Sequence, residues 1–599
     1  MSMFAKLSTL IDRRPFLPIV FVWMVVCLMM AVVSPHLAEG RFPDVDDSLR
    51  LVQVRDLLAG QAWFDLYQHR MNPPEGTLMH WSRLVDAPLA ALIWVLALVL
   101  PQASAEYITC FAMPLLVLLA TMIIVGSLAR ERFGARIALL AVFAFVLMPM
   151  VPGQFQPMRI DHHSWQVLSV AIAVWGIFRP DPARGALIAG LAMAAGLMIS
   201  LETIVLAAGL ALVLLLRWLE NSRQSVWLAR YLQSLALGLA GLFALTRGAA
   251  DLMQHCDAIS PAHIGFFGTV AVGTSVLAAR AHLHPLAVLS GLAVTGLAGL
   301  ALVGWAAPAC LASPFAGLDP LVHKHWYLKV TEGLPLWHRG FSEAFPAALQ
   351  CLFALGVAAC AALRGEVTDR RWWRDYALVL AVATVAGFVT YRSIAFAGMV
   401  ATIPFGWFAA RMFERWRAST GLAPKLGVAA ALYIAFLPAG IIGMVSPWVD
   451  ALSPVRTTAT IPSTCQIEHN GAKLNSVAPA KVFAHLDISP DVLAYSHHSV
   501  VASGHHRSEQ AMRTVIAAFI SQPDVAYEMI LETKSDYLVA CVDLREMSLY
   551  AQSGGQDSLA ALLIRGDTPV WLKPVPISAA GNLRFWQIVK PNASLDGVD

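Results

Sequence analysis

The sequence predicts a polytopic α-helical membrane protein with about 13 transmembrane helices, followed by a C-terminal soluble α/β domain. Three observations lead to this class. Hydrophobic residues make up 58% of the 599 residues and charged residues only 14%, against about 25% charged residues in soluble proteins. Long apolar runs recur up to residue 446. Basic residues cluster in alternate connections between successive apolar runs, as expected for loops on one side of a bilayer.

The apolar runs predict where the chain crosses the membrane. A helix needs roughly 20 mostly apolar residues to span the hydrocarbon region. Runs near this length lie at 16–34, 105–128, 137–153, 164–178, 185–200, 204–216, 227–246, 262–280, 284–306, 341–363, 376–390, 394–410 and 426–446. We therefore expect a transmembrane domain over residues 1–446.

The basic clusters orient these crossings. With the N-terminus in the cytoplasm, all of the clusters lie on the inner side, as the positive-inside rule requires: Lys6, Arg13 and Arg14; Arg130, Arg132 and Arg136; Arg179 and Arg184; Arg217, Arg223 and Arg230; Arg364, Arg370, Arg371 and Arg374; Arg411, Arg415, Arg417 and Lys425. We expect an integral protein of a bacterial inner (plasma) membrane whose C-terminal domain is periplasmic or extracellular.

One apolar segment, residues 86–101, is too short to fit this count. If it crossed the bilayer, the following arginine cluster would lie outside and every later loop would invert. We expect it to lie in the outer leaflet, within a long first external loop over residues 35–104. A second large external loop is expected at 307–340.

Residues 447–599 have the polar spacing of a soluble domain. Strand-like runs occur at 536–541 and 568–572, and a helical pattern at 509–520. Cys465 and Cys541 lie in this domain and could pair if the compartment is oxidising, a point that the sequence leaves open. The other six cysteines are expected to be small buried residues in or beside apolar segments: Cys27, Cys110, Cys256, Cys310, Cys351 and Cys360.

Ionisable residues collect on the predicted outer face. Ionisable groups at the edge of a transmembrane bundle are costly and are candidates for function. Carboxylates with imidazoles can hold a divalent cation, or one carboxylate can act as a general base. An interfacial arginine suits a phosphate or diphosphate. The set comprises Asp44, Asp46, Asp47, Arg50, His69, Arg70, His80, Arg159, Asp161, His162, His163, Glu202, Asp319, His323, Lys324, His325, Lys329, Glu332, His338, Arg339 and Arg392.

Simpler structural explanations exist for several of these residues. Asp44 fits a helix N-cap, and Asp161 fits a helix start about as well as a ligand. The histidines that follow Asp161 fit interfacial polar residues, and Lys324 and Lys329 fit solvated loop charges. Arg392 has the weakest structural explanation, because it lies between two short apolar runs. The functional interpretation rests on the coincidence of all these groups on one face.

The order of these motifs resembles the GT-C superfamily of membrane glycosyltransferases, and most closely the catalytic subunit of oligosaccharyltransferases. The resemblance covers roughly residues 35–450. It rests on the acidic motif Asp46–Arg50 with the following Arg55–Gly60, on Met150–Gly153 with Arg159–His163, on Lys329–Glu332, and on Tyr391-Arg392. The helix count and the C-terminal soluble domain are similar too. The resemblance implies a GT-C-like fold.

The resemblance also implies roles for particular residues. Asp46 would be the catalytic carboxylate, assisted by Asp161 and Glu332, and a divalent cation, Mg or Mn, would be held by Asp46, Asp161, His163 and Glu332. Substrate-binding roles would fall to Arg392, Arg50, His325 and Lys329. Some relatives have Asn where this chain has His162, so the metal's identity and metal-free catalysis by a carboxylate base both stay open.

The implied function is transfer of a sugar or oligosaccharide from a polyprenyl-(di)phosphate carrier to an acceptor at the extracytoplasmic face, with inversion. The family's Trp-Trp-Asp-Tyr-Gly acceptor motif is absent; the comparable stretch, 493–507, carries several histidines. The acceptor could therefore be a glycan, a lipid or a protein. Alternatives are protein N-oligosaccharyltransferase proper and a transporter or flippase for lipid-linked glycans. The net charge of +3 does not favour nucleic acid.

Overall fold

A computed structural model describes residues 16–280, 282–312, 314–315, 317–365, 367–440, 442–443, 464–577 and 581–591. The chain divides into two compact units. Unit 1 comprises Met1–Ala38, Trp81–Pro314 and Thr331–Thr457. Unit 2 comprises Glu39–His80, Phe315–Val330 and Thr458–Asp599. The boundary expected near residue 446 stays a prediction, because residues 444–463 lie outside the described residues.

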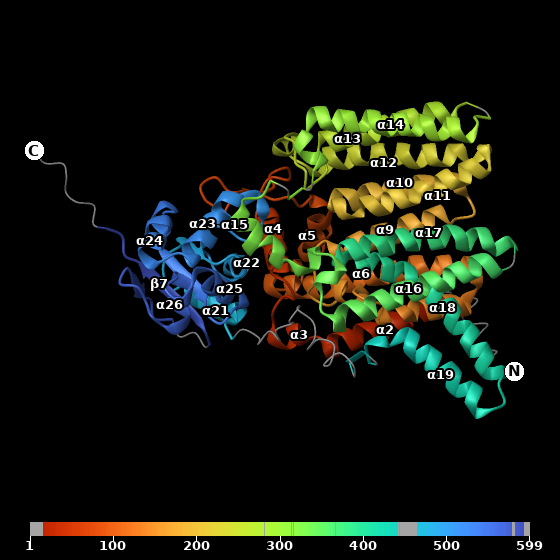
Figure 1. Ribbon diagram of the computed structural model, residues 1–599. Helices are drawn as coiled ribbons and strands as arrows, with labels where there is room; N and C mark the ends of the chain where they lie inside the picture. Colours follow the sequence, from red (N-terminus) through yellow and green to blue (C-terminus); the bar gives the residue numbers. More distant parts are fainter. Residues whose placement is uncertain are drawn as a thin grey trace, which may run out of the picture. The chain divides into compact units, whose positions relative to one another are not determined.

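Unit 1 is built from helices (Figure 1). Ten segments in the described part of the chain are long and apolar enough to cross a membrane. Their helices are α2 (Phe16–Val33), α6 (Gln102–Phe133), α10 (Pro182–Ile199), α11 (Ile204–Glu220), α12 (Ser225–Thr246), α13 (Pro261–Ala278), α14 (Pro285–Ala306), α16 (Phe341–Arg364), α17 (Val367–Val389) and α18 (Ile394–Ala418).

Shorter helices complete unit 1. Three of them fall on expected runs: α7 (Ala135–Ala144), α9 (His163–Ile177) and α19 (Leu422–Phe436). Every expected run thus contains a helix, while the number of actual crossings stays a prediction. The segment expected in the outer leaflet forms α5 (Arg83–Ala97). The remaining short helices are α3 (Pro35–Glu39), α8 (Val151–Gln154), η1 (Phe145–Leu147), η2 (Leu201–Thr203), η3 (Ser222–Gln224), η4 (Ala249–Leu252), η5 (Pro308–Leu311), η7 (Thr331–Gly333), η8 (Leu336–His338) and η9 (Tyr391–Ser393).

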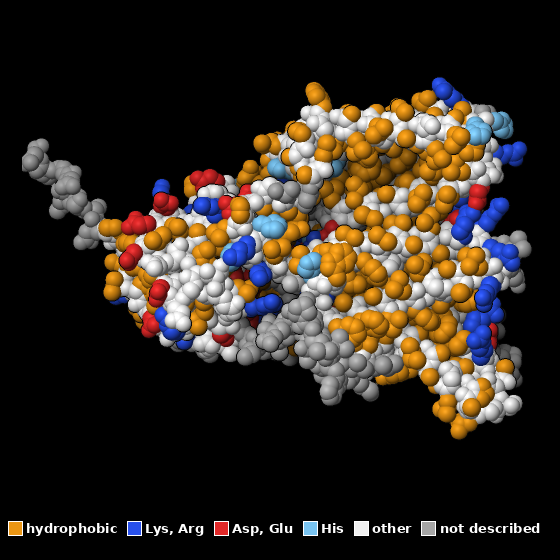
Figure 2. Space-filling model, viewed as in Figure 1, with side chains coloured by type: hydrophobic (Ala, Val, Ile, Leu, Met, Phe, Trp, Pro, Cys, Tyr) orange, Lys and Arg blue, Asp and Glu red, His pale blue; other side chains and the backbone are white. Residues whose placement is uncertain are grey.

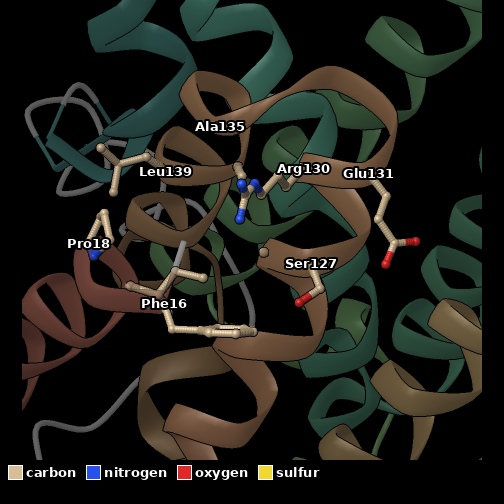
Figure 3. A pocket seen from close by; sticks show the side chains of 10 residues that line it. Phe16, Pro18, Ser127, Arg130, Glu131, Ala135 and Leu139 are labelled. Atoms are coloured by element: carbon tan, nitrogen blue, oxygen red, sulfur yellow. The ribbon is translucent and has the colours of Figure 1, made fainter. Parts of the chain in front are cut away.

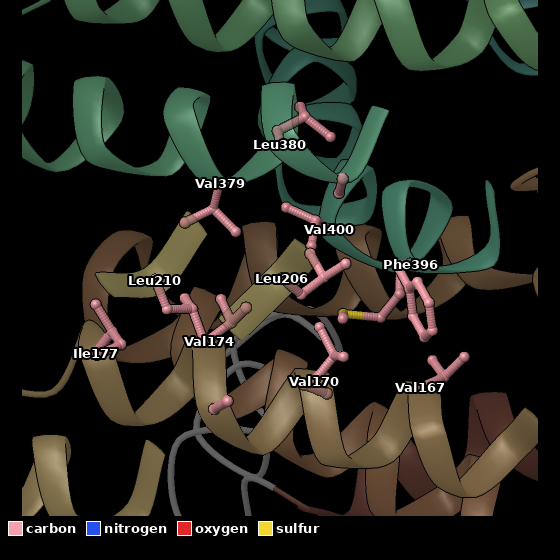
Figure 4. Packing of buried hydrophobic residues seen from close by; sticks show 14 of the residues in the cluster. Val167, Val170, Val174, Ile177, Leu206, Leu210, Val379, Leu380, Phe396 and Val400 are labelled. Carbon is pink, nitrogen blue, oxygen red and sulfur yellow. The ribbon is translucent and has the colours of Figure 1, made fainter. Parts of the chain in front are cut away.

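Helix α18 lies at the centre of unit 1. In its most apolar stretch 89% of the residues are buried, against 17% in the corresponding stretch of α14. One face of α9 meets α11, α17 and α18 in the core shown in Figure 4, where Val167, Val170, Val174 and Ile177 repeat at helical spacing. The Tyr376 hydroxyl donates a 2.7 Å hydrogen bond to the Val400 carbonyl, which joins α17 to α18.

Close helix approach in unit 1 depends on small residues. A Cβ at Gly190 of α10 would lie 2.4 Å from the Tyr231 carbonyl oxygen of α12, which no real structure tolerates. Lipid tails are as apolar as the helix surfaces, so helices in a bilayer associate through close packing more than through hydrophobic burial. The outer flank of the bundle is correspondingly covered with apolar side chains (Figure 2).

Unit 2 contains a five-stranded mixed sheet in the order β4-β3-β5-β7-β6. Strands β4 (Ser499–Val500), β3 (Lys481–Ala484) and β5 (Tyr537–Cys541) are parallel, and β7 (Leu583–Ile588) and β6 (Leu572–Pro574) are antiparallel neighbours. Its helices are α4 (Val45–Leu58), α15 (Pro320–His325), α21 (Ile467–Leu474), α22 (Ser489–Tyr495), α23 (Glu509–Ile520), α24 (Pro523–Glu532), α25 (Arg545–Gly554) and α26 (Leu559–Arg565), with η6 (Tyr327–Lys329), η10 (His506–Ser508) and the hairpin β1 (Tyr67–Gln68) and β2 (Thr77–Leu78).

The predicted helix 509–520 and the strand near 536–541 are present, but the strand expected at 568–572 was wrong. The observed strand, β6, begins only at Leu572. A turn precedes it, in which the Leu572 amide donates to the Pro569 carbonyl, and proline itself has no amide hydrogen to offer a sheet.

The first external loop folds together with the C-terminal domain. Ser48 of α4 donates a 2.5 Å hydrogen bond to Asp491 of α22, and Arg55 of α4 donates to the Ala494 carbonyl. Farther along, the Asn72 amide donates to the carbonyl of Val500 in β4. Eight consecutive residues of α4, from Asp47 to Val54, are buried, so the middle of this helix is covered all round.

Four cysteines form two disulfides. Cys465 pairs with Cys541 inside unit 2, which answers the question left open by the sequence. Cys256 pairs with Cys310 in unit 1, so the expectation that these two are simple buried residues was wrong. They lie in the segments that follow α12 and α14, which brings together residues 54 positions apart.

Thiol counting tests both bridges. Denatured, unreduced protein should expose four reactive thiols, those of Cys27, Cys110, Cys351 and Cys360, and reduction should raise the number to eight. Replacing Cys465 and Cys541 by Ser should lower the free energy of unfolding of unit 2 by about 2–5 kcal/mol, because the unfolded chain loses a constraint. Cys360→Ser is the control, with one thiol fewer and unchanged stability. Six thiols without reductant would mean that one bridge is absent.

Candidate functional site

A buried acidic and imidazole cluster opens α9 in unit 1. Asp161 is 1% exposed, and the side chains of His162 and His163 are also buried. The Asp161 carboxylate contacts the His162 ring and lies 3.3 Å from His163 Nε2. One ligand atom from each of the three residues lies within 4.8 Å of the others. The helix begins at His163, so Asp161 lies just outside it and its carboxylate accepts a hydrogen bond from the His162 amide.

Three short 3-10 turns bring further charges to this cluster. Glu202 lies in η2, Glu332 in η7 and Arg392 in η9. Arg392 forms an ion pair with Glu202, and its Nη1 lies 3.5 Å from Glu332 Oε1. Glu332 Oε1 also lies 3.9 Å from His163 Nε2. The guanidinium therefore joins two carboxylates that come from separate parts of the chain.

Local hydrogen bonds hold the loop that carries Glu332. The Tyr391 amide next to Arg392 donates to the Leu334 carbonyl at 3.0 Å. Arg339 donates to the Thr331 hydroxyl at 2.6 Å, and its guanidinium lies over the Tyr391 ring, 4.7 Å from the centroid. These contacts fix η7 against η9, which sets the distance between Glu332 and Arg392.

The donor set of this cluster fits a divalent cation. Asp161, Glu202 and Glu332 supply carboxylate oxygens, and His163 supplies an imidazole nitrogen. Carboxylate and imidazole donors together suit borderline metals such as Zn²⁺ or Mn²⁺. The residues that would hold the ion are Asp161 and His163, with Glu332 beside them.

The other predicted site residues belong to unit 2. Asp46 lies in the first turn of α4, and Asp44 caps this helix by accepting a 3.1 Å hydrogen bond from the Asp46 amide, as the simpler explanation expected. Arg50 is buried in the same helix. His325 is buried beside the Ser553 hydroxyl, 3.2 Å away, whereas Lys329 is exposed. Unit 1 thus unites Asp161, His163, Glu332 and Arg392, while Asp46, Arg50, His325 and Lys329 lie in unit 2.

Two residues gain importance only from the structure. Glu202 was one of many groups expected on the outer face, with no role of its own, and it is the direct partner of Arg392. His505 was part of the histidine-bearing stretch 493–507, and its Nε2 lies 3.8 Å from Asp46 Oδ1. The charge of Glu202 and the density of histidines near 505 were the available sequence signals.

Comparison with solved structures identifies the fold. The archaeal oligosaccharyltransferase AglB from Archaeoglobus fulgidus, in complex with an inhibitory peptide and a dolichol-phosphate, matches with a TM-score of 0.65 and 14% identity over 98% of this chain and 75% of that chain. The Archaeoglobus fulgidus oligosaccharyltransferase tethered to an acceptor peptide matches with a TM-score of 0.58 and 12% identity over 96% of this chain and 74% of that chain. The complex of the same enzyme with Zn and sulfate matches with a TM-score of 0.55 and 11% identity over 94% of this chain and 72% of that chain.

The likeness is one of fold, since identities stay at 14% or less. It confirms the expected GT-C-like architecture and the resemblance to oligosaccharyltransferases. Together with the ten long apolar helices, it supports an integral membrane protein. No protein-family model matches the chain, and no curated protein matches it.

The contact between α4 and α22 predicts a pH dependence. Burial raises the pKa of Asp491 to about 7; the nearby carboxylates of Glu468 and Asp44 add to the rise, and the Ser48 hydrogen bond opposes it. In the unfolded chain the pKa of an Asp is about 3.9. The folded state binds the proton more tightly, so the stability it contributes is present at low pH and is lost as pH rises from about 4 to about 7.

Asp491→Asn should therefore flatten the fall in melting temperature of unit 2 between pH 5 and pH 8. Thermal unfolding followed at each pH by near-ultraviolet circular dichroism measures this slope. Asp557→Asn, at an exposed position of the same unit, is the matched control and should keep the wild-type slope. Equal slopes for Asp491→Asn and wild type would contradict the assignment.

Proposed function

We propose that this protein is a glycosyltransferase that moves a sugar or oligosaccharide from a polyprenyl-(di)phosphate carrier to an acceptor at the extracytoplasmic face of the membrane. The observation that carries the proposal is the meeting of Asp161, His163, Glu332 and Arg392 in one buried cluster, on the fold of an oligosaccharyltransferase. These are the residues to which the resemblance assigns metal and phosphate binding.

Arg392 is the proposed ligand of the carrier phosphate. Its guanidinium offers five donors in a fixed plane, and a phosphate accepts them in pairs. Glu202 and Glu332 contact the same guanidinium and hold its orientation before the carrier binds. A pre-oriented cation stabilises the negative charge that develops on the leaving phosphate without reorganisation at the moment of reaction.

Asp161, His163 and Glu332 are the proposed metal ligands, as the grouping of their carboxylate and imidazole donors supports. A divalent cation bound there would supply Lewis-acid stabilisation of charge on the phosphate. The Archaeoglobus fulgidus enzyme has been solved with Zn and sulfate, which supports a metal on this fold without naming the metal for this chain.

Asp46 is the proposed base. The acceptor's nucleophilic atom forms a bond to the anomeric carbon while the bond from that carbon to the phosphate oxygen breaks. The bonding electrons leave with the phosphate, and the acceptor's proton goes to a carboxylate oxygen of Asp46. A single displacement of this kind inverts the anomeric centre.

The Cys256–Cys310 disulfide supports the proposed sidedness. Disulfides persist in oxidising compartments and are rare in the cytosol. The two cysteines follow α12 and α14, and Glu202 follows α10. If α11 to α14 each cross the bilayer, these three helix ends lie on the same side. The cluster of unit 1 would then face the compartment in which the bridge forms.

Transfer from labelled lipid-linked sugars tests the proposal. Purified protein in nanodiscs should release lipid phosphate, and Asp46→Asn, Asp161→Asn and Arg392→Gln should each lower turnover by about a hundredfold or more, because each removes charge stabilisation used in the transition state. EDTA should abolish turnover if a metal is required. Glu414→Gln, at an exposed position of α18, is the control and should retain wild-type turnover.

The outcomes separate the alternatives. If turnover is lost in the variants but EDTA has no effect on wild type, catalysis is metal-free and uses a carboxylate base. Wild-type turnover in both Asp46→Asn and Arg392→Gln would contradict the assigned roles. An absence of turnover from every lipid-linked pool would contradict the proposed function itself.

A further inference from the structure

Asp46 has a buried histidine beside it inside unit 2. His505 Nε2 lies 3.8 Å from Asp46 Oδ1. The His505 side chain is 4% exposed and that of Asp46 is 38% exposed. The imidazole therefore lies on the protein side of the carboxylate, and part of the carboxylate stays accessible.

Ser503 determines which ring nitrogen of His505 carries the proton. The Ser503 hydroxyl lies 2.9 Å from His505 Nδ1 and 3.3 Å from the Met71 sulfur. A thioether is a weak acceptor, so the hydroxyl donates preferentially to Nδ1. The proton of a neutral imidazole then resides on Nε2, the nitrogen that lies 3.8 Å from Asp46 Oδ1.

Asp46 and His505 are held within one unit by contacts on both sides. On the Asp46 side, Ser48 and Arg55 of α4 bond to Asp491 and to the Ala494 carbonyl. On the His505 side, Arg507 donates to the carbonyl of Met79, just after β2. His80 covers the His505 ring, with 5.8 Å between the ring centroids.

We propose that His505 is a positioning residue for the Asp46 carboxylate: its Nε2–H stabilises the anion across 3.8 Å and favours the orientation that leaves the other oxygen for the acceptor. The inference rests on the proposed function, because it gives Asp46 its partner in that reaction. Residues that orient a reacting carboxylate in this way typically change activity by about tenfold to a hundredfold when removed.

Two amide substitutions of His505 separate positioning from packing. Gln can place its amide nitrogen near Nε2, within reach of Asp46, whereas Asn places it near Nδ1, within reach of Ser503 only. His505→Ala and His505→Asn should each lower kcat by about tenfold to a hundredfold with KM for the lipid-linked donor unchanged, and His505→Gln should recover most of kcat. His497→Gln, at an exposed position of the same stretch, is the control.

The result separates this inference from the proposed function. If Asp46→Asn is inactive and His505→Ala has wild-type kcat, the inference is wrong and the proposed function stands. Equal losses in the Gln, Asn and Ala variants would mean that His505 acts through packing, which also contradicts it. If wild-type protein transfers no sugar, the proposed function falls, and with it the role of His505.

A second site is carried by an independent observation in unit 1. A cavity of about 320 Å³ lies between α2, α6 and α7. Its walls are mostly apolar, and Arg130 is the basic side chain among the residues that line it (Figure 3). Glu131 also lines it, but its carboxylate is turned away from Arg130 and lies 3.9 Å from Arg179.

The surroundings of Arg130 suggest the chemistry of an occupant. The cavity lies at the C-terminal end of α6, whose last turn carries Arg130 and Arg132. An acyl chain suits the apolar walls, and a phosphate suits a guanidinium at the membrane surface.

We propose that this cavity holds one anionic phospholipid, with its phosphate at Arg130 and an acyl chain against Phe16, Ile19 and Leu139. Native mass spectrometry of protein from phosphatidylglycerol nanodiscs should show one retained lipid, and fewer from phosphatidylcholine. Arg130→Gln should lower retention about tenfold, since it removes a charge-assisted contact. Ser127→Phe should lower it by filling the cavity, and Arg136→Gln, outside the cavity, should not.

Equal retention by wild type, Arg130→Gln and Ser127→Phe would overturn the lipid site. Displacement of the lipid by inorganic phosphate alone would overturn the choice of a phospholipid and reassign Arg130 to a free phosphate. Neither result depends on sugar transfer, so this site is tested even if the protein has another activity.

Discussion

The ion pair between Arg392 and Glu202, with Glu332 beside it, is the constraint on which the arrangement of unit 1 depends. Charges at a membrane bundle incur a large desolvation penalty unless they are paired. A single guanidinium fixes three turns, η2, η7 and η9, that are distant in sequence. Removing it would leave two carboxylates next to the Asp161 cluster with no nearby positive charge among these residues, which explains why an arginine stands between two apolar runs.

The residues implied in chemistry divide between two units with different means of support. Unit 1 holds its charges at the ends of packed helices, among which the most apolar stretch of α18 is 89% buried. Unit 2 holds Asp46 on a helix whose partners, Asp491 and Ala494, are more than 400 residues farther along the chain. The first external loop is therefore held in part by contacts with the C-terminal domain. The position of Asp46 depends on that domain as much as on its own motif.

Hydropathy predicted the positions of the long apolar helices of unit 1, because a bilayer demands length and apolar character from each crossing. The same reasoning failed where partners are set by tertiary structure. Cysteines beside apolar segments were interpreted as small buried residues, so the Cys256–Cys310 disulfide was missed. Glu202 carried no local signal for Arg392, and His505 none for Asp46. The strand at β6 was misplaced because alternating apolar residues outweighed the effect of Pro569 on the ladder.

The contrast between the two carboxylate environments follows from what each would have to do. A metal-binding carboxylate must stay ionised and immobile. Asp161 is buried, and its carboxylate contacts the imidazoles of His162 and His163. A base must reach a proton on a substrate, so Asp46 needs an accessible oxygen, and burial on every side would defeat it. An exposed carboxylate, however, rotates freely and loses orientation. A single buried imidazole behind it, such as His505 at 3.8 Å, would resolve the conflict by favouring one orientation of the carboxylate.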